Sequence, residues 1–172
     1  PQSILKHKGI IANPNCSTII MVMALKPIYD LAKIKRVIVS TYQAVSGAGK
    51  EGIDELDAQV RDHSEGREMT ANILPSASAE KHYPIAFNLI PQIDVFCDNL
   101  YTKEEMKMVN ETKKIMEDYE MRITATTIRV PVYRSHSESV NIELEKEVDL
   151  GAMREALAKF PGVTVQDDPS KQ

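Results

Sequence analysis

The pattern of hydrophobic and polar positions predicts helices alternating with a strand in the first third of the chain. Residues 17–32 are apolar on nearly all sides, which predicts a helix that is buried all round. The short β-branched run 36–42 predicts a strand. After it, Ile53, Leu56 and Val60 recur at helical spacing, so we expect an amphipathic helix with these side chains on its buried face.

A long polar segment separates this first part from a further helix. Residues 63–84 are polar and rich in serine, so we expect a loop outside the core, of a length typical of functional or contact segments. Residues 102–119 predict a helix that begins with a capping box formed by Thr102 and Glu105. We expect Glu105, like the pair 113–114 of lysines, to lie on the solvated face of this helix.

The last third of the chain predicts strands and one short helix. Residues 122–134 and 138–148 alternate in the manner of strands in a half-exposed antiparallel sheet. Asp149 is expected to cap the short helix, and 162–166 to form a last strand. Helices and strands are mixed without strict βαβ repetition, so the predicted class is α+β, with a mixed or antiparallel sheet packed with helices.

Composition narrows the function classes. The chain has 172 residues, 42% hydrophobic and 27% charged, which suits one well-cored domain over 1–172. A net charge of -4 argues against nucleic acid or an anionic membrane as the main partner. No apolar run approaches the ~20 residues that cross a bilayer.

Two widely separated cysteines form neither a disulfide framework nor a metal clip, so we expect a reducing, cytoplasmic location and no metal site. Because the chain starts at Pro1, we also expect that it is part of a longer protein.

The glycines at 47, 49 and 52 match the GxGxxG pattern of dinucleotide-binding loops. The rest of that unit is missing, because a polar stretch replaces the second buried strand and its terminal acidic residue. The Walker pattern also fails, since Lys50 is followed by Glu51. We therefore interpret this segment as a glycine turn that allows a close approach to the backbone.

Cys16 lies in the polar turn "NPNCST", directly ahead of the apolar run. A cysteine is ordinarily a small buried hydrophobe, and for Cys97 we keep that structural interpretation. A helix N-terminus favours the thiolate, which is the nucleophilic form of cysteine. Pro14 and Asn15 mark such a helix start, so Cys16 is a candidate nucleophile.

Five further side chains are candidates for chemistry, and four of them also have a plainer interpretation. His136 lies where one predicted strand turns into the next, and is either a turn histidine or a proton carrier. Arg129 within a β-branched strand either extends off the sheet or offers its planar fork to a carboxylate. Glu104 and Lys107 share a helix face as a solvated ion pair or as part of a site. Gln43 ends a strand beside the glycine turn, where sites are often built.

The motifs "NPNCST", "VSTYQAVSGAG", "HYPIAFNLIPQID", "EEMKMVNETKKIM" and "RVPVYRSHSESV" together resemble the aspartate-β-semialdehyde dehydrogenase family over nearly the whole chain. The resemblance implies a two-domain subunit in which a Rossmann domain binds NADP. This chain is similar to the second, catalytic and dimerisation domain, whose fold resembles that of glyceraldehyde-3-phosphate dehydrogenase. The cofactor domain and the family's closing segment are expected to lie outside it.

The resemblance also implies roles for individual residues. Cys16 would be the nucleophile that takes the acyl group of L-4-aspartyl phosphate as a thioester, with phosphate as the leaving group. His136 would be the acid/base residue, and Gln43 would orient the intermediate. Arg129 would bind the substrate carboxylate, Glu104 its ammonium and Lys107 its phosphate. Asn15 would help to hold the phosphate or the acyl oxygen.

The resemblance further assigns the turn around Ser46, Gly47 and Gly49 to the nicotinamide end of NADP. It implies a cytoplasmic homodimer or tetramer in the synthesis of lysine, diaminopimelate, threonine, methionine and isoleucine. The long polar segment would then contact the dimer partner. Three alternatives stay open: a related acyl-phosphate reductase of the N-acetylglutamyl-phosphate type, a thiol hydrolase, and a dimerisation module without chemistry of its own.

Overall fold

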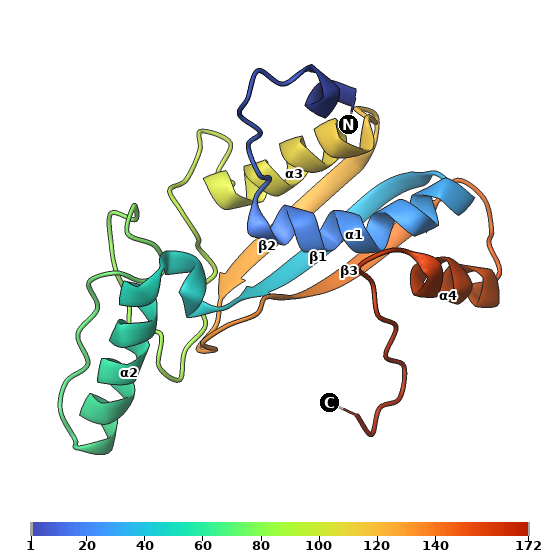
Figure 1. Ribbon diagram of the computed structural model, residues 1–172. Helices are drawn as coiled ribbons and strands as arrows, with labels where there is room; N and C mark the ends of the chain where they lie inside the picture. Colours follow the sequence, from blue (N-terminus) through green and yellow to red (C-terminus); the bar gives the residue numbers. More distant parts are fainter. Residues whose placement is uncertain (1, 172) are drawn as a thin grey trace. The chain divides into compact units, whose positions relative to one another are not determined.

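The computed structural model describes residues 2–171 and has the α+β class that the sequence predicts. Its three strands form one sheet in the order β2-β1-β3. Figure 1 shows that β1 and β2 point the same way, while β3 runs in the opposite direction, so the sheet is mixed. The strands are β1 (Ile34–Gln43), β2 (Arg122–Arg129) and β3 (Ser137–Leu144).

The helices lie close to their predicted positions. They are α1 (Cys16–Leu31), α2 (Lys50–Ser64), α3 (Lys103–Met116) and α4 (Leu150–Lys159), with short 3-10 helices η1 (Gln2–Lys6) and η2 (Val45–Ala48). Asp149 caps α4 as expected, because its side chain accepts a hydrogen bond from the Ala152 N–H. The strand expected at 162–166 is absent. No helix within residues 2–171 combines the length and the apolar character that a bilayer crossing requires.

The chain divides into two compact units. Unit 1 comprises the residues up to Ile38, Asn110–Ile123, and the residues from Val140 onwards. Unit 2 comprises Val39–Val109 and Thr124–Ser139. Each of the three strands contributes residues to both units.

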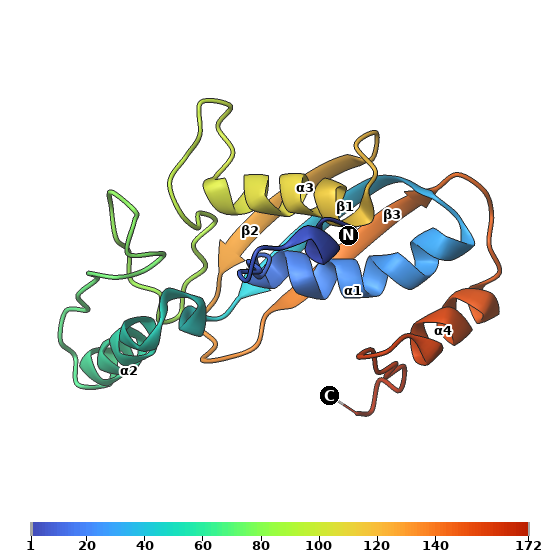
Figure 2. The same ribbon diagram turned by 45° about the horizontal axis from the view of Figure 1, so that its top comes forward.

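In unit 1, α1 is buried on one side only. Met21 and Leu25 are buried, whereas Ile20 is 41% exposed. The prediction of a helix buried all round is therefore wrong. One side of α1 packs inward and α4 covers part of another, as Figure 2 shows, and the remaining apolar side chains stay partly accessible.

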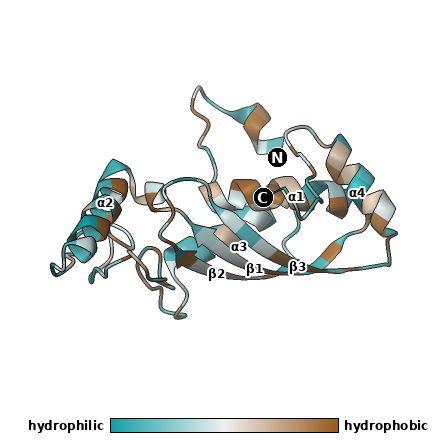
Figure 3. Ribbon diagram, turned by 90° about the horizontal axis from the view of Figure 1, so that it is seen from below, coloured by the Kyte–Doolittle hydropathy of each residue, from teal (hydrophilic) through white to brown (hydrophobic). Residues whose placement is uncertain are grey.

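The strands of unit 1 keep apolar residues on the surface. Ile38 of β1 and Val140 of β3 are both exposed, and hydrophobic and hydrophilic residues are interspersed along the three strands in Figure 3. The alternation of burial along β1 follows the period of two that a sheet with one packed face requires. Of the two strands for which the sequence predicts a half-exposed antiparallel sheet, β2 alternates in burial but runs parallel to β1 (Figure 1), and β3 has no fully buried residue, so the prediction is only partly confirmed.

The core of unit 2 includes part of the segment that was expected to lie outside it. One hydrophobic cluster of this core is formed by Val45, Leu56, Leu74, Ile85, Ala86 and Ile90. Leu74 is fully buried because the Glu55 carboxylate of α2 accepts hydrogen bonds from three successive backbone N–H groups, those of residues 72–74. The carboxylate thereby ties the polar segment to the helix, and the prediction of a wholly external loop is wrong.

Gln59, rather than Val60, occupies the buried face of α2. Val60 is 39% exposed, contrary to the prediction, whereas Gln59 is fully buried. Gln59 donates to the Thr70 carbonyl at 2.8 Å and accepts from the N–H groups of Ile85 and Ala86 at 2.8 and 3.0 Å. An amide that makes three hydrogen bonds can be buried at little cost in free energy. A pattern of apolar positions does not predict the burial of such a residue.

At the start of α3 the predicted capping box forms. Thr102 N–H donates to Glu105 Oε2 at 2.8 Å, and Glu105 N–H donates to Thr102 Oγ1 at 3.2 Å. The solvated position predicted for Glu105 is wrong, however, because the residue is only 9% exposed. Its Oε1 accepts a further hydrogen bond from the Thr127 N–H of β2 at 3.1 Å, which joins helix and strand.

We expect Glu105→Ala to lower the free energy of unfolding by about 3 kcal/mol, because it leaves two buried N–H groups without their acceptor. Urea titration followed by circular dichroism measures this. The control Glu68→Ala removes an exposed glutamate and should change stability by less than about 0.5 kcal/mol. A loss for Glu105→Ala as small as that of the control would contradict the buried role of the carboxylate.

Candidate functional site

The turn that carries Cys16 is built in unit 1 by its own polar groups. Asn15 is the N-cap of α1, and its Oδ1 accepts from the Thr18 N–H at 3.0 Å and from the Thr18 hydroxyl at 3.3 Å. The Asn15 N–H donates to Glu111 Oε2 of α3 at 2.7 Å. Cys16 is the first residue of α1 and is exposed, so it is not the buried hydrophobe of the plainer interpretation.

A buried chain of polar contacts runs through unit 2. Gln43 Nε2 lies 3.1 Å from Thr41 Oγ1 and 3.3 Å from Glu104 Oε1. Glu104 Oε2 lies 3.4 Å from the Lys107 ammonium. The Glu104 side chain is only 7% exposed, so this pair is not the solvated ion pair of the plainer interpretation. Buried carboxylates of this kind need donors, and here an amide and an ammonium supply them.

Arg129 ends β2 with its guanidinium inside unit 2. It is 2% exposed, so it does not extend off the sheet into solvent. Nε donates to the Pro75 carbonyl at 3.0 Å and Nη1 to the Ala44 carbonyl at 2.7 Å. These two backbone acceptors fix the plane of the guanidinium, and its orientation is set before any ligand binds.

His136 is held by the backbone at the end of β1. Its Nδ1 accepts from the Ala44 N–H at 3.0 Å. Burial lowers the pKa of His136, and the charge of Arg129 lowers it further, against the opposing effects of Glu104 and the Ser135 backbone. A neutral ring whose Nδ1 is an acceptor carries its proton on Nε2, so His136 presents an Nε2–H donor.

The glycine turn lies against these two side chains. A Cβ at Gly47 would stand 2.7 Å from Arg129 Nη1 and 3.5 Å from His136 Cε1, so only glycine fits there. Gly49 has φ 84°, in the left-handed region, and open space around it. The Ser46 N–H donates to the Tyr133 carbonyl at 3.2 Å, which fixes the turn. The turn therefore exposes backbone with little side-chain bulk.

The predicted site residues fall into two groups. Asn15 and Cys16 belong to unit 1. Unit 2 contains Gln43, Ser46, Gly47, Gly49, Glu104, Lys107, Arg129 and His136. Within unit 2 the contacts described above form two sets, one of Gln43, Glu104 and Lys107 and one of Gly47, Arg129 and His136 around Ala44. Sequence reasoning missed Asp94, whose carboxylate lies 3.2 Å from Lys107 Nζ. Asp94 sits in an irregular segment, where no spacing rule indicates a partner.

The family model for the dimerisation domain of semialdehyde dehydrogenases matches residues 25–172. The chain belongs to this family. It is 56% identical to the aspartate-semialdehyde dehydrogenase of Aquifex aeolicus, over 95% of this chain and 46% of the relative. For the enzyme of Bacillus subtilis the identity is 53%, over 97% and 49%. The chain thus spans about half the length of the curated relatives it matches, and the resemblance read from the motifs is confirmed.

Solved structures agree with this membership of the semialdehyde dehydrogenase family. Aspartate semialdehyde dehydrogenase II of Vibrio cholerae, complexed with ASA, has a TM-score of 0.84 and 47% identity over 93% of this chain and 46% of that chain. The enzyme of Candida albicans, solved with NADP, has a TM-score of 0.57 and 25% identity over 88% and 36%. A probable aspartate-semialdehyde dehydrogenase of Pseudomonas aeruginosa, at 21% identity, shows the shared fold, with a TM-score of 0.80 over 94% and 47%.

Cys97, the other cysteine of this semialdehyde dehydrogenase domain, is half-buried in a turn. Its N–H donates to the Tyr101 carbonyl at 2.7 Å, and its carbonyl accepts from the Leu100 N–H at 2.9 Å. An isolated antiparallel bridge between Phe96 and Thr102 brackets this turn. Cys97 is thus only partly buried, and the fully buried position predicted for it is wrong.

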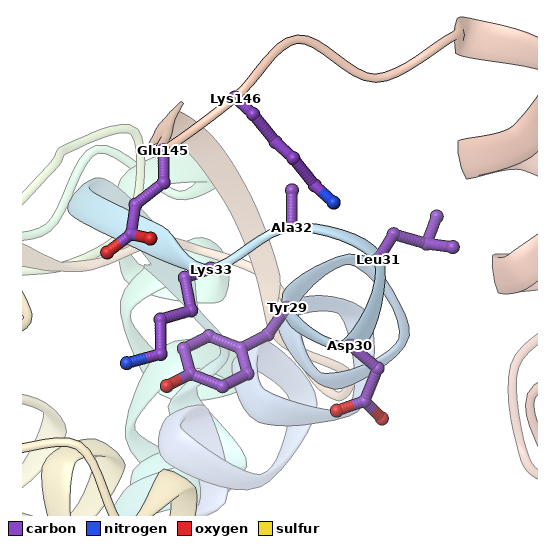
Figure 4. A pocket seen from close by; sticks show the side chains of 7 residues that line it. All are labelled: Tyr29, Asp30, Leu31, Ala32, Lys33, Glu145 and Lys146. Atoms are coloured by element: carbon purple, nitrogen blue, oxygen red, sulfur yellow. The ribbon is translucent and has the colours of Figure 1, made fainter.

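A surface hollow of about 380 Å³ in unit 1 contains none of the predicted site residues (Figure 4). It lies where α1 ends and is lined by Tyr29, Asp30, Leu31, Ala32, Lys33, Glu145 and Lys146. Tyr29 donates to Asp118 Oδ2 at 2.7 Å, and burial together with this carboxylate raises the pKa of Tyr29 to about 12. The phenol is thus a permanent donor that ties α1 to the segment after α3.

Glu138 of β3 gives this domain a pH-dependent stability. Burial raises the pKa of its carboxyl to about 7, and Oε1 has no hydrogen-bond partner among residues 2–171. Because the pKa of this carboxyl is higher in the folded than in the unfolded state, its contribution to stability is complete at a pH below the unfolded pKa. That contribution is lost as the pH rises through about 7.

We therefore expect Glu138→Gln to stabilise the domain relative to wild type at pH 8 by about 1–2 kcal/mol, a value reduced for partial exposure. At pH 4 the difference should disappear. Urea unfolding at both pH values measures it, with the exposed Glu68→Gln as the control. A stability difference that does not change with pH would contradict the raised pKa.

Proposed function

We propose that the chain is the catalytic and dimerisation domain of an aspartate-semialdehyde dehydrogenase. The enzyme would carry out the reductive dephosphorylation of L-4-aspartyl phosphate to L-aspartate 4-semialdehyde with NADPH, and the reverse oxidation with phosphate. The observation that carries the proposal is the contact chain from the buried Gln43 and Glu104 to the partly exposed Lys107, in a unit that also holds Arg129 and His136. Family membership and the named relatives support it.

The charges of unit 2 match a zwitterionic phosphorylated substrate. We assign the Arg129 guanidinium to the substrate carboxylate, Glu104 to its ammonium group and Lys107 to phosphate. The alternative N-acetylglutamyl substrate has no ammonium group. The Glu104 carboxylate would then have no ligand cation to bind, which favours the aspartyl substrate.

In the proposed reaction, the Cys16 thiolate attacks the acyl carbon of the aspartyl phosphate. A C–S bond forms, the C–O bond to phosphate breaks, and phosphate leaves, which produces a thioester on Cys16. We assign Asn15, which caps the same helix, to the acyl or phosphate oxygen. Proton transfer is assigned to His136, whose Nε2–H can donate to the developing oxygen, and orientation of the intermediate to Gln43.

NADP fits the geometry of the glycine turn, where Ser46, Gly47 and Gly49 present backbone with little side-chain bulk. When bound, this cofactor supplies or accepts the hydride of the reaction. The chain's own contribution would be to position the nicotinamide end beside Arg129 and His136. Most of the NADP site is assigned to a Rossmann domain outside residues 1–172.

We also propose that the protein is a cytoplasmic homodimer or a tetramer built from dimers, in lysine, threonine, methionine and isoleucine synthesis. The family model is that of a dimerisation domain, which supports self-association through this part of the protein. Light scattering on the chain of residues 1–172 at micromolar concentration should give at least twice the mass of the monomer. A monomer under these conditions would contradict association through residues 1–172.

The proposed activity is tested by phosphate-dependent reduction of NADP with L-aspartate 4-semialdehyde, measured on the full-length protein. We expect turnover that requires phosphate and is lost when the acetylated glutamate semialdehyde replaces the substrate. Preference for the acetylated compound would favour the related acyl-phosphate reductase of the N-acetylglutamyl-phosphate type. Ester hydrolysis without nucleotide would indicate a thiol hydrolase. No turnover in any of these assays would indicate a dimerisation module without chemistry of its own.

A further inference from the structure

Asp94 makes a contact with Lys107 that the proposed function does not use. Its Oδ2 lies 3.2 Å from Lys107 Nζ, and Glu104 Oε2 lies 3.4 Å from the same atom. Asp94 comes from the irregular segment after Pro91, whereas Glu104 and Lys107 share the first turns of α3. Two separate segments of unit 2 therefore supply one carboxylate each to a single ammonium.

The two carboxylates give the ammonium a direction. A lysine ammonium carries three N–H donors and otherwise rotates about its terminal bond. With two donors directed at Asp94 and Glu104, the torsion is fixed and the third N–H has one orientation. Among residues 2–171 that third donor has no partner, and the Lys107 side chain is 43% exposed, so a ligand can reach it.

Asp94 is itself held rigidly. Its Oδ1 accepts from the Val95 N–H at 2.8 Å and from the Ser78 hydroxyl at 3.0 Å. Its N–H donates to Ser76 Oγ at 3.2 Å, and its carbonyl accepts from Gln92 Nε2 at 3.3 Å. The backbone lies in the left-handed region, with φ 69°, which aspartate tolerates better than most residues. Every polar group of the residue is thus engaged.

The charges agree with this arrangement. Burial alone would raise the pKa of the Asp94 carboxyl, but its hydrogen bonds and the charge of Lys107 lower it. Burial alone would likewise lower the pKa of Lys107, but the two carboxylates raise it. The ammonium is therefore kept charged although it is partly desolvated.

We propose that Asp94 is a positioning residue, which together with Glu104 fixes the Lys107 ammonium so that its third N–H is directed at the phosphate oxygens of the substrate. The inference rests on the proposed function, in which Lys107 binds phosphate. Asp94 touches neither substrate nor cofactor in this scheme and acts only through Lys107. The ligand is the phosphoryl group or free phosphate, which share the same oxygens.

Asp94→Asn is the variant that tests the proposal. Asparagine tolerates the left-handed backbone and can still accept from Val95 and Ser78 through its carbonyl, but it turns an NH2 group towards Lys107. In the full-length protein we expect the KM for phosphate to rise about tenfold and the KM for semialdehyde to change by less than about twofold. A phosphate KM within about twofold of wild type would overturn the proposal.

The control Ser78→Ala removes a hydrogen bond from the same carboxylate without changing its charge. We expect both KM values to stay within about twofold of wild type. If Ser78→Ala reproduces the effect of Asp94→Asn, loosening of the segment explains the result and the positioning role is wrong.

Two further measurements separate this inference from the proposed function. If Lys107→Ala leaves the phosphate KM unchanged, the assignment of Lys107 to phosphate fails, whatever Asp94 does. An NMR titration of the Lys107 side chain needs no turnover, and there Asp94→Asn should lower the pKa of Lys107 relative to wild type. An unchanged titration would show that Asp94 does not hold the ammonium, even in a protein without activity.

Discussion

Cys16→Ser is expected to lower kcat for the phosphate-dependent oxidation of aspartate semialdehyde by about 10⁴-fold or more. A serine hydroxyl at this position is a far weaker nucleophile at neutral pH than a thiolate, because it is rarely deprotonated. The side chain is exposed at the first turn of α1, where Asn15 already satisfies the Thr18 N–H. The substitution should therefore leave the helix cap and the fold intact. Steady-state kinetics on the full-length protein measures the loss, and circular dichroism checks the fold.

Cys97→Ser is the matched control for this loss. Cys97 is half-buried in a turn that is held by backbone hydrogen bonds, so an alcohol in place of the thiol should reduce kcat by less than about threefold. Equal losses from both substitutions would mean that Cys16 is not distinguished from the other thiol. The assignment of the nucleophile would then be wrong.

Arg129→Lys is expected to lower kcat/KM for aspartate semialdehyde by about 100-fold. The guanidinium donates at once to the carbonyls of Pro75 and Ala44. A lysine ammonium is a point charge and cannot reproduce that planar fork, so the orientation of the positive charge is lost. The Ala44 backbone also donates to His136, so a shift of this residue would disturb the imidazole as well.

Arg36→Lys provides the control for Arg129→Lys. The Arg36 guanidinium is 48% exposed and pairs with Glu143 at 3.3 Å on the surface of unit 1, so its replacement should change kcat/KM by less than about twofold. Thermal unfolding of both variants separates loss of stability from loss of function. If Arg129→Lys keeps wild-type kcat/KM, the guanidinium does not belong to the substrate site.

Local patterns predicted the elements of the fold well. The β-branched run correctly predicted β1. The Thr102–Glu105 capping box predicted the start of α3, and Asp149 predicted the start of α4. These signals depend on residues close together in the sequence, where steric preference and capping act directly. The predictions failed where a distant partner decides burial, as for Glu105, which also accepts from Thr127.

The candidate site was predictable only in part, for the same reason. The motifs around Cys16 and His136 identified residue types suited to chemistry, but the contacts that hold the site come from irregular segments. Asp94 lies thirteen positions before Lys107, in the irregular segment ahead of α3. Glu55 and Gln59 of α2 hold a loop by hydrogen bonds to its backbone N–H groups. Such side-chain to backbone contacts follow no period, so a pattern of apolar positions does not reveal them.

The most direct measurement traps the acyl-enzyme. The full-length protein is mixed with aspartate semialdehyde and NADP without phosphate, quenched in acid, digested and examined by mass spectrometry. The account predicts an aspartyl group on the peptide that contains Cys16, which disappears when phosphate is added before the quench. An aspartyl group on the peptide that contains Cys97, or none on Cys16 in a protein that turns over normally, would contradict it.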